Sequence, residues 1–598
     1  DLIGAAAANT GKVFTEADPE VSEAIDFAEF YPYSVKAYTD LENIECQGKG
    51  VGLVISPWNF PIAIPCGGIS ASLAAGNTVI FKPASAAVLT AWELCQCFWR
   101  AGISKKALQF VPCSGSEIGE KLTAHPAVDF IILTGGTDTG MKILETRPGI
   151  FLAAETGGKN ATIVTAMSDR DQAVKNIIHS AFSNCGQKCS ATSLVVLEEE
   201  VFEDENFKKQ LADAAKSCNV GSVWEFQNKM GTLIHPPKGD LEKAFIELEP
   251  GESWVLKPEM VHDNPYMWTP GIKWGVQPGN YTHVTEFFGP LIGVMCAKNL
   301  DHAIDLVNQT GYGLTSGLES LDRREQAHWK DRIRAGNLYV NRGITGAVVL
   351  RQPFGGMGKS ALGVGIKAGS PSYVAQFMDF EETGFPCVGP IKNEHALLRI
   401  TQEWKMKLDW GGLSEFEGDL RMTIRAVRSY LYHVEQEFSQ ENDYFHLRGQ
   451  DNILRYLPIG KVLVRMHEAD SLFEVLARIA AVKLSGCELI LSIPKDLDNG
   501  VTAFVHGKEG RRFIGEASVL CQTDEDVIQM MSQVQRIRYA AAERVPPAVF
   551  EAAAKTGFYI GRTRVMMEGR IELLQYFQQQ SICDSYHRYG NLGERAII

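Results

Sequence analysis

The sequence predicts an α/β fold with parallel sheets, and three observations support this. Short runs of Val, Ile and Leu alternate with amphipathic stretches, which is the pattern of consecutive β-α-β units. The runs 51–55 and 78–81 contain no charged side chain, as expected for strands that are covered on both faces. A similar strand–helix–strand pattern returns near residue 460, so we expect one α/β unit early in the chain and a related one late.

The predicted elements follow one another in a regular order. Residues 15–45 predict a helix rich in acidic and aromatic residues. After it we expect a strand at 51–55, a helix at 67–75, a strand at 78–82, a helix at 86–101 and a strand at 107–111. The α/β pattern continues from 159 to 345, interrupted by charged, poorly patterned segments near 198–230 and 250–282. A mostly helical stretch then runs to 450.

Length and composition indicate a soluble protein of several domains. A chain of 598 residues is too long for one hydrophobic core. Its net charge of −14, without a basic block, argues against a nucleic-acid partner. None of the 13 cysteines forms a Cys-x-x-Cys pair, which indicates reduced thiols in a cytoplasmic protein, with no disulfide framework and no metal site.

One uncharged segment, 50–81, is long enough to cross a membrane. Pro57, Pro61 and Pro65 would break a single helix there. The segment is better explained as a strand, a loop, a buried helix and a second strand. We therefore expect no transmembrane segment, and no signal peptide is visible.

The late α/β unit resembles the first in the order and spacing of its parts. In each, a glycine opens a strand, a helix follows, and a second glycine precedes the next strand; these glycines are Gly52 and Gly76 in the first unit and Gly460 and Gly486 in the second. The late unit lacks a Trp-Asn pair after its first strand, and Ser492 falls near the position of Lys82. We interpret it as a degenerate copy that kept its packing residues and lost its chemistry. The alternative is that any two β-α-β units look this similar.

Cys189 and Glu155 are the candidate reactive pair. A thiol and a carboxylate can trap an aldehyde covalently, support its oxidation and hydrolyse the resulting thioester. Lys188, next to the thiol in sequence, is expected to lower its pKa. Gly157 and Gly158 allow a close backbone approach. Each motif alone also has a purely structural explanation, because buried inert cysteines and surface glutamates before glycine turns are common.

Polar residues at the ends of the predicted strands form a candidate ligand site. Asn59 follows the strand 51–55, at the edge where open α/β sheets bind ligands, and its amide can join the Cys189 backbone N–H in an oxyanion hole. Lys82 ends the next strand and can hold ribose hydroxyls. The run 134–140 follows a strand and can open a helix, offering backbone N–H groups to a pyrophosphate. The structural alternatives are a turn cap for Asn59 and a charge reaching solvent for Lys82.

Seven motifs, taken in order, resemble the aldehyde dehydrogenase superfamily. They are Pro57-Trp58-Asn59, Lys82-Pro83, Thr134-Gly135-Gly136, Glu155-x-Gly157-Gly158-Lys159, Gly186-Gln187-Lys188-Cys189, Glu286-Phe287-Phe288-Gly289-Pro290 and Pro353-Phe354-Gly355-Gly356. The resemblance implies the aldehyde dehydrogenase fold, with a Rossmann-like NAD-binding domain and an α/β catalytic domain. Here a degenerate Rossmann-like C-terminal domain would follow.

The same resemblance implies residue roles. Cys189 would be the nucleophile, Glu155 the general base and Asn59 the oxyanion donor. NAD would be the cofactor, and its implied binding residues are Ser56, Pro57, Trp58, Lys82, Ser85, Gly135, Gly136, Thr137, Glu286 and Phe288. Among these, Lys82 and Glu286 would bind ribose hydroxyls and Phe288 would pack beside the nicotinamide. An acid stands at the position of Ser85 in many NAD-selective relatives, which leaves discrimination against NADP open.

A closer resemblance is to the L-glutamate γ-semialdehyde dehydrogenases, and among them to the dehydrogenase half of bacterial bifunctional proline utilisation proteins. It is carried by the segments 336–342, 345–349, 351–356, 367–371, 568–574 and 586–591. It implies that Thr345, Gly346 and Ala347 anchor the α-carboxylate of a small-molecule substrate, with Lys188 and Ser190 at its polar end. Gly369-Ser370-Pro371 replaces the more usual Gly-Gly-Pro.

The resemblance also implies an organisation of the chain. The expected parts are an NAD-binding domain at 1–157 with an oligomerisation segment near 25–50, a catalytic domain at 158–380, a linker and helices at 381–450, and a non-catalytic domain and tail at 451–598. We expect a homo-oligomer. We further expect this chain to be part of a longer polypeptide, whose proline dehydrogenase domain would bind FAD and lies outside the sequence in hand.

These observations lead to one hypothesis and two alternatives. The hypothesis is NAD-dependent oxidation of L-glutamate 5-semialdehyde, the open form of 1-pyrroline-5-carboxylate, to L-glutamate. One alternative is an aldehyde dehydrogenase for another semialdehyde, such as succinate semialdehyde. A cationic side chain that clamps the far carboxylate, in place of the anchor around Gly346, would favour this alternative. The other is a non-catalytic scaffold fragment, against which the joint presence of Cys189, Glu155 and Asn59 argues.

Overall fold

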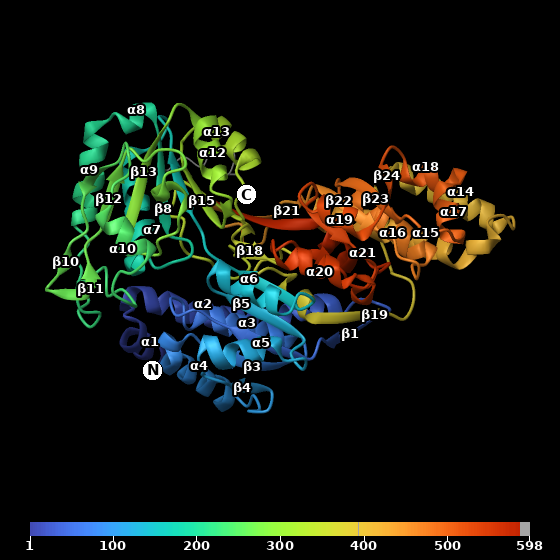
Figure 1. The fold of residues 1–598 in the computed structure, drawn as a ribbon, viewed down its shortest axis with the longest axis horizontal. Coiled ribbons are helices and arrows are strands. Elements are labelled where there is room, and N and C mark those ends of the chain that lie inside the picture. The colour runs from blue at the N-terminus through green and yellow to red at the C-terminus, as the bar shows by residue number, and fades with distance from the viewer. Residues whose placement is uncertain (393, 587–598) are drawn as a thin grey trace.

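The computed structural model describes residues 1–392 and 394–586, and it contains three large sheets with helices packed against them (Figure 1). The predicted α/β class is therefore confirmed. Residues 587–591 of the tail motif lie outside the described residues.

The first sheet has six strands in the order β18-β6-β5-β2-β3-β4. Their bounds are β2 Val51–Ile55, β3 Thr78–Lys82, β4 Leu108–Phe110, β5 Phe130–Thr134, β6 Phe151–Glu155 and β18 Ala361–Leu362. The five strands from β2 to β6 run parallel, and β18 pairs antiparallel with β6. The connecting helices are α3 Ala63–Ala74, α4 Val88–Arg100, α5 Glu120–Ala124 and α6 Thr137–Thr146. The uncharged segment 50–81 is thus a strand, a loop, a buried helix and a strand, as predicted.

The second sheet has ten strands in the order β20-β21-β27-β16-β15-β7-β8-β13-β12-β9. Its central strands are β7 Asn160–Val164, β8 Thr192–Glu198, β12 Gly271–Trp274, β13 Leu291–Ala297, β15 Thr315–Glu319 and β16 Asn337–Val340, with β9 Ser253–Leu256 at one edge. Its helices are α7 Arg170–Phe182, α8 Glu199–Phe202, α9 Glu205–Lys216, α10 Asp240–Ile246, α11 Tyr281–Val284, α12 Leu300–Gln309 and α13 Arg323–Arg332. The segment near 198–230, poorly patterned in sequence, contains the amphipathic helix α9, which begins at the N-cap Asp204.

The far end of the chain completes this second sheet. Strand β27 (Phe577–Ser585) pairs parallel with β16 and antiparallel with β21 (Gln450–Pro458), which also holds the short edge strand β20 (Asn442–Asp443). Figure 1 shows this red strand reaching from the C-terminal lobe into the green and yellow sheet. The expected domain boundary at residue 450 gives no sign of this, because strands from both sides of that boundary belong to the second sheet.

The third sheet repeats the strand order of the first. Its order is β24-β23-β22-β25-β26, and all four strand pairs are parallel. The strands are β22 Lys461–Arg465, β23 Glu488–Pro494, β24 Ser518–Gln522, β25 Arg536–Arg538 and β26 Ile560–Gly561. Taken in chain order, both sheets therefore place their first five strands as third, second, first, fourth and fifth. This shared topology supports the degenerate copy over a chance likeness of two β-α-β units.

The register of the third sheet also shows which residues changed. Ile55 pairs with Lys82 in the first sheet, and Arg465 pairs with Ser492 in the third, so Ser492 takes the place of Lys82. Arg465 is buried there and donates to the Ser492 hydroxyl and the Gln522 carbonyl, both at 3.0 Å. An arginine of the protein itself thus occupies the carboxyl edge of this sheet, where an open α/β sheet binds its ligand.

Helices cover the third sheet and join it to the rest. They are α14 Ala396–Asp409, α15 Glu417–His433, α16 Leu472–Leu484, α17 Gly500–His506, α18 Lys508–Ile514, α19 Asp524–Met530, α20 Pro547–Ala554 and α21 Gly569–Glu572. Helix α16 is buried along almost its whole length and starts with a capping box between Ser471 and Glu474. Among the helices of the described residues, none combines the length and apolar character that a membrane crossing requires.

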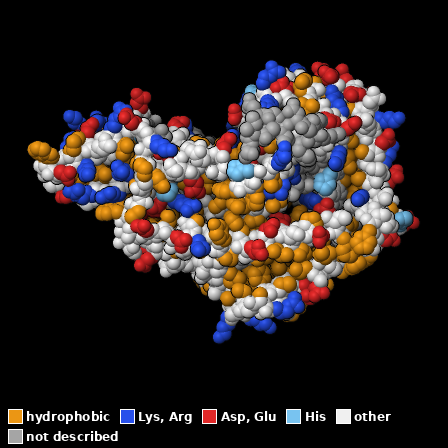
Figure 2. Space-filling view, turned by 180° about the vertical axis from the view of Figure 1, so that it is seen from behind, with side chains coloured by type: hydrophobic (Ala, Val, Ile, Leu, Met, Phe, Trp, Pro, Cys, Tyr) orange, Lys and Arg blue, Asp and Glu red, His pale blue; other side chains and the backbone are white. Residues whose placement is uncertain are grey.

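Several smaller elements complete the fold. At the N-terminus, α1 (Leu2–Thr10) and the long α2 (Phe14–Thr39) pack against each other and against α4 and α3 respectively. The antiparallel pairs are β1 Ile44–Gly48 with β19 Met378–Glu382, β10 Met260–Val261 with β11 Asn264–Trp268, and β14 Tyr312–Gly313 with β17 Met357–Gly358. Seen from behind, the molecule shows hydrophobic side chains gathered over its wide part, among mixed acidic and basic side chains (Figure 2).

Candidate active site

A cavity of about 630 Å³ brings together most of the predicted catalytic and substrate-binding residues. Its wall includes the reactive pair Cys189 and Glu155. It also includes all five predicted substrate-binding residues, which are Lys188, Ser190, Thr345, Gly346 and Ala347. Residues far apart in sequence therefore meet around one cavity, as the prediction of a single site requires.

Cys189 follows a tight left-handed turn at 184–186 and precedes strand β8. Asn184, Cys185 and Gly186 all have φ near +60° (52°, 56° and 67°), and such a run is rare outside glycine. A Cβ at Gly186 would lie 2.3 Å from the Gly289 carbonyl oxygen, so only glycine fits that position. The Cys189 carbonyl accepts a hydrogen bond from the Asn160 amide at 2.6 Å, which fixes the turn beyond the thiol.

The setting of Cys189 disfavours its thiolate. Burial, followed by the negative charges of Glu286 and Glu155, raises the pKa of the thiol to about 12, against a smaller opposing effect of the Cys189 and Ser190 backbone N–H groups. The prediction that Lys188 lowers this pKa is wrong. The Lys188 ammonium points away and pairs with Glu16 at 2.5 Å and the Ser183 hydroxyl at 2.9 Å.

Asn59 lies beside the turn that carries Cys189. Its side-chain N–H₂ group donates to the Gln187 carbonyl at 3.1 Å, two residues before the thiol. That group has two hydrogens, so a second donor is available for an oxyanion. A buried ion pair holds the Asn59 backbone: Lys12 donates to the Asn59 carbonyl at 2.9 Å and pairs with Glu20 at 2.6 Å. Glu20 in turn accepts from the first N–H groups of the loop–helix junction before α3.

Glu155 is the last residue of strand β6, and its carboxylate accepts a hydrogen bond from the Gly356 backbone N–H at 2.8 Å. Burial raises the pKa of Glu155 to about 7, although the positive charge of Lys367 acts in the opposite direction. A carboxyl group with this pKa is partly deprotonated near neutral pH, which suits a group that must take a proton from water.

The two glycines after Glu155 have steric reasons to be glycine. A Cβ at Gly157 would lie 2.2 Å from the Glu286 carboxylate, and one at Gly158 would lie 2.7 Å from the Cys189 carbonyl oxygen. The Gly158 N–H donates to Glu286 at 2.8 Å. The predicted close backbone approach is confirmed, and its partner is Glu286 as well as the cysteine turn.

The predicted cofactor residues lie outside the 630 Å³ cavity, most of them on the edge of the first sheet and Glu286 and Phe288 in the loop before β13 of the second. Strands β3, β2, β5 and β6 are neighbours, so their carboxyl ends bring together Lys82, Ser56 and the Gly135–Gly136 turn. The Ser56 N–H donates to the Lys82 carbonyl at 3.3 Å. Ser85 is exposed at the start of a short 3₁₀ turn. Pro57 and Trp58 follow β2 of the first sheet, and the Trp58 ring meets the Phe288 ring from the second sheet edge to face, with 5.7 Å between ring centroids.

Helix α6 presents an uncapped N-terminus to the same edge. Its N-cap is Gly136, which offers no side-chain hydrogen bond to the first turn beginning at Thr137. A Cβ on Gly136 would meet no atom within 4 Å, so space lies open over that turn. Backbone N–H groups at such a helix start attract a pyrophosphate. The donor set and the open cradle therefore fit a dinucleotide.

The substrate end of the cavity combines an anchor loop with an acidic wall. Gly346 has φ +99°, a conformation that favours glycine, and it is exposed to the cavity. Facing it, helix α2 supplies the acidic residues Glu16, Asp18, Glu20, Glu23 and Asp26. Burial, together with the nearby Glu20 charge, raises the pKa of Glu23 to about 8. The cavity thus offers backbone donors on one side and carboxyl groups on another.

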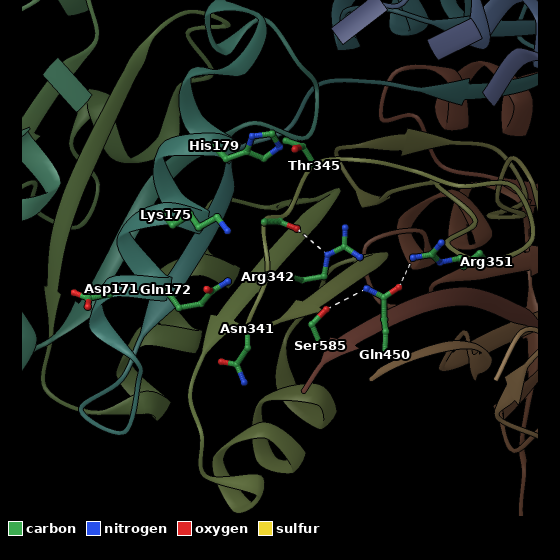
Figure 3. Close-up of a pocket in the computed structure, with 11 residues that line it drawn as sticks. Asp171, Gln172, Lys175, His179, Asn341, Arg342, Thr345, Arg351, Gln450 and Ser585 are labelled. Atoms are coloured by element: carbon green, nitrogen blue, oxygen red, sulfur yellow. Dashed lines mark hydrogen bonds between the residues drawn. The ribbon is translucent and has the colours of Figure 1, made fainter. Parts of the chain in front are cut away.

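A second cavity of about 620 Å³ lies next to the anchor loop and shares His179 and Thr345 with the first (Figure 3). Its lining includes three cationic side chains, Lys175, Arg342 and Arg351. Figure 3 shows Gln450, from the C-terminal strand β21, hydrogen-bonded to Arg351 on one side and to Ser585 of β27 on the other. The late part of the chain therefore builds a wall beside the predicted substrate anchor.

Sequence reasoning missed four residues that support the site. Lys12 and Glu20 hold the Asn59 loop, Glu16 pairs with Lys188, and Lys367 lies behind Glu155. Lys367 stands in a motif that the sequence already singles out, 367–371. Lys12 lies between α1 and α2. Glu16 and Glu20 lie in α2, an acid-rich helix whose sequence does not show which acids face inward.

A comparison with known proteins agrees with these observations. A model of the aldehyde dehydrogenase family matches residues 1–382. The chain is 36% identical over 387 residues to 1-pyrroline-5-carboxylate dehydrogenase of Geobacillus thermodenitrificans, which covers 62% of this chain and 74% of the relative. It is 35% identical over 393 residues to the protein of the same name from Bacillus subtilis, covering 62% and 75%.

Solved structures give two further likenesses. Proline Utilization A (PutA) from Corynebacterium freiburgense has a TM-score of 0.84 and 37% identity, and the match covers 99% of this chain. The chain spans only 55% of that PutA chain. A 1-pyrroline-5-carboxylate dehydrogenase from Thermus with bound NAD has a TM-score of 0.59 and 33% identity, covering 64% of this chain and 77% of the other.

Proposed function

This chain belongs to the aldehyde dehydrogenase family, and from that premise we propose that it oxidises L-glutamate γ-semialdehyde, the open form of 1-pyrroline-5-carboxylate, to L-glutamate with NAD. The observation that carries the proposal is the meeting of Cys189, Glu155 and the Gly346 anchor around one cavity. The printed names of the relatives agree with this substrate.

The chemistry begins at Cys189. The thiol releases its proton to solvent, its sulfur adds to the aldehyde carbon, and the carbonyl oxygen becomes an oxyanion. The free hydrogen of the Asn59 amide and the Cys189 backbone N–H stabilise that oxyanion. Because the thiol pKa is raised to about 12, thiolate formation requires a change on substrate or cofactor binding, such as movement of the Glu286 or Glu155 charge away from the sulfur.

When bound, NAD accepts the hydride that leaves the former aldehyde carbon. The residues that would hold it are Lys82 and Glu286 at ribose hydroxyls and the start of helix α6 at the pyrophosphate. Phe288, which contacts Trp58, would pack beside the nicotinamide. Loss of the hydride converts the adduct on Cys189 into a thioester.

Glu155 then completes the turnover. Its carboxylate takes a proton from a water molecule, the resulting hydroxide attacks the thioester carbon, and the carbon–sulfur bond breaks to release the carboxylic acid and the Cys189 thiolate. A water-activating carboxylate favours hydrolysis over transfer to a thiol acceptor, since the latter needs no such base.

The substrate end of the cavity supports an amino acid aldehyde. The Gly346 and Ala347 backbone offers donors to an α-carboxylate, which would be costly to bury without them. Glu16 and Glu20 are already paired with Lys188 and Lys12, but Asp18 and Asp26 of α2 also line the cavity and can attract an α-ammonium group. Succinate semialdehyde has no ammonium group, so the acidic wall gives it no advantage.

NADH formation from 1-pyrroline-5-carboxylate tests the proposal. We expect turnover by the wild-type chain and none above background by Cys189→Ala. Cys185→Ala, which changes a buried thiol four residues away, is the matched control and should keep NAD affinity. A folded wild-type chain that binds NAD but oxidises succinate semialdehyde in preference to this substrate would refute the assignment.

We also propose that the chain acts as part of a larger assembly. Its match to 55% of a PutA chain supports a longer polypeptide with a proline dehydrogenase domain that binds FAD. Exposed apolar side chains on α2 and α4, including Tyr33 at 73% and Trp92 at 40% exposure, support contact with further protein, such as a second copy. The boundaries at residues 157, 380 and 450 remain our proposal for its domains.

A further inference from the structure

The backbone around Gly355 and Gly356 connects the general base to a buried lysine. On one side, the Gly356 N–H donates to the Glu155 carboxylate at 2.8 Å. On the other, the Lys367 ammonium donates to the Gly355 carbonyl oxygen. The Gly355 carbonyl and the Gly356 N–H belong to the same peptide bond. Lys367 and Glu155 are therefore bound to the two ends of one peptide unit.

Lys367 is an unusual lysine. It is only 1% exposed, and its second partner is the side-chain oxygen of Asn337 at 3.4 Å. Within the described residues, no carboxylate oxygen lies within 4.0 Å of its ammonium group, so it has no direct ion-pair partner. A buried charge without such a partner is costly, and its nearest counter-charge is Glu155, reached through the shared peptide.

The packing leaves little freedom in this arrangement. A Cβ at Gly355 would lie 2.8 Å from the Glu155 carboxylate, and one at Gly336 would lie 2.6 Å from the Lys367 ammonium nitrogen. The Lys367 backbone N–H is held by the Gln579 side chain at 2.8 Å. The lysine is thus built into the fold at this place and is not a mobile side chain that happens to point inward.

A cation at the carbonyl end of a peptide strengthens the donor at the other end. An ammonium group polarises the Gly355 carbonyl, which makes the Gly356 N–H a better donor to a carboxylate. Resting on the proposed function, we propose that Lys367 is a positioning residue for thioester hydrolysis, acting through the Gly355–Gly356 peptide to hold Glu155 as a carboxylate ready to accept a proton from water.

The charges around the pair agree with this role. Burial raises the pKa of Glu155 to about 7 and lowers that of Lys367 to about 7, while the charge of each favours the charged form of the other. The other titratable groups that face Glu155 are the Cys189 thiol and the Tyr373 hydroxyl, both of which stay protonated near neutral pH because burial raises their pKa values. Loss of the Lys367 charge therefore raises the pKa of Glu155 further.

The test compares Lys367→Met with wild type in two reactions. The first is NADH formation from 1-pyrroline-5-carboxylate, followed in both the pre-steady state and the steady state. The second is hydrolysis of 4-nitrophenyl acetate without NAD, which requires only acylation and deacylation of Cys189. Lys359→Met, an exposed lysine on the same loop, is the matched control.

We expect Lys367→Met to keep a burst of NADH and to lose steady-state turnover near neutral pH by about 10- to 100-fold, with KM nearly unchanged. This loss is smaller than the roughly 100- to 10,000-fold that a general base contributes, because Lys367 acts only through Glu155. The pH at which hydrolysis is half-maximal should move upward by about one unit or more. Hydrolysis of the aryl ester should show the same upward shift. Lys359→Met should match wild type in NADH turnover, in the pH profile of that turnover and in the pH profile of ester hydrolysis.

A Lys367→Met variant that is folded, with both pH profiles within twofold of wild type, would overturn the proposal. If that variant does not fold, Lys367→Arg decides the matter: a permanent charge should leave the profile unshifted or shifted to lower pH, and an upward shift would overturn it. Failure of the proposed substrate is an outcome separate from failure of the proposed role of Lys367. Wild type without NADH formation refutes the substrate, whereas the ester profiles still test Lys367.

Discussion

At the scale of single residues, the surroundings of Cys189 keep its thiol protonated. Burial raises the thiol pKa most, and the carboxylates of Glu286 and Glu155, proposed to bind ribose and to activate water, raise it further. The side chains that are needed later in the proposed cycle therefore help burial to suppress the nucleophile in the ligand-free protein. This arrangement protects the cysteine from oxidation and alkylation, which require the thiolate.

Alkylation with iodoacetamide measures this suppression. In the ligand-free protein, the rate at Cys189 should rise steadily with pH from neutral to mildly alkaline conditions, without a plateau, because the thiol pKa is about 12. Glu155→Gln removes a nearby negative charge, which lowers the thiol pKa and should accelerate alkylation above the Glu155 pKa of about 7. Mass spectrometry of the labelled peptide, with Cys189→Ala as the blank, gives the rate. A plateau near neutral pH would contradict this account.

The sequence predicted which residues meet at the proposed site but not their electrostatics. Cys189, Glu155 and Asn59 were found because each stands at a motif, and the structure places all three at one site. The effect of Lys188 was misjudged because adjacent residues in a turn point in different directions. Which way a long side chain extends depends on distant partners, here Glu16 on α2, and no local pattern records it.

At the scale of elements, the junction of α1 and α2 supports the catalytic loop. Lys12 and Glu20 are both almost fully buried, and together they bind the Asn59 carbonyl and the N–H groups before α3. Three backbone groups, the Asn59 carbonyl and the Ile62 and Ala63 N–H groups, are thus satisfied by a single cation and a single anion. Asn59, the proposed oxyanion donor, is thereby held through its backbone carbonyl.

Lys12→Met should therefore be strongly destabilising, because it leaves the Glu20 carboxylate buried and unpaired. We expect a loss of about 3–5 kcal/mol in the free energy of unfolding. The measurement is chemical denaturation followed by circular dichroism. Lys36→Met, at the exposed end of α2, serves as the control and should change stability little. Equal stability of the two variants would show that the buried pair does not hold the junction.

Strand positions in the first sheet were predictable because uncharged runs bounded by glycines mark buried parallel strands. Strand β27 was not, since its Gln578, Gln579 and Gln580 have the composition of a surface segment. In the structure, Gln579 and Gln580 are buried and hydrogen-bonded to the backbone of the catalytic half, at Lys367 and Ala335. Pairing between such distant segments leaves no periodic signal in either one.

At the scale of the whole molecule, one topology is used twice with different contents. The first sheet leaves its carboxyl edge open at Gly136, whereas the third fills the corresponding edge with Arg465. The late unit kept the strand order and lost the open space at the carboxyl edge of its sheet. Its contribution lies instead in the strands around it, since β21 and β27 extend the catalytic sheet.

A substitution at Ile582 in β27 tests how far the second sheet depends on these strands. It is 2% exposed and packs in the same core as Ile163, Leu318 and Leu338 of the second sheet. Ile582→Asp should lower the free energy of unfolding by several kcal/mol, on the order of the cost of an unpaired buried charge, and abolish NADH formation. Val519→Asp, at an exposed position on the third sheet, is the control. Full activity of a folded Ile582→Asp variant would show that β27 is dispensable.

The position of β27 has a consequence for how the protein is made. Gln580 contacts Ala335 across 245 positions of sequence, so a ribosome that has completed every proposed catalytic residue has not yet supplied the strand that lies beside β16. Until residue 585 emerges, that side of the sheet offers unpaired backbone groups to any other strand nearby. Synthesis that stops early therefore yields a chain with the reactive cysteine but an unfinished sheet, and such a product is a natural substrate for chaperones and proteases.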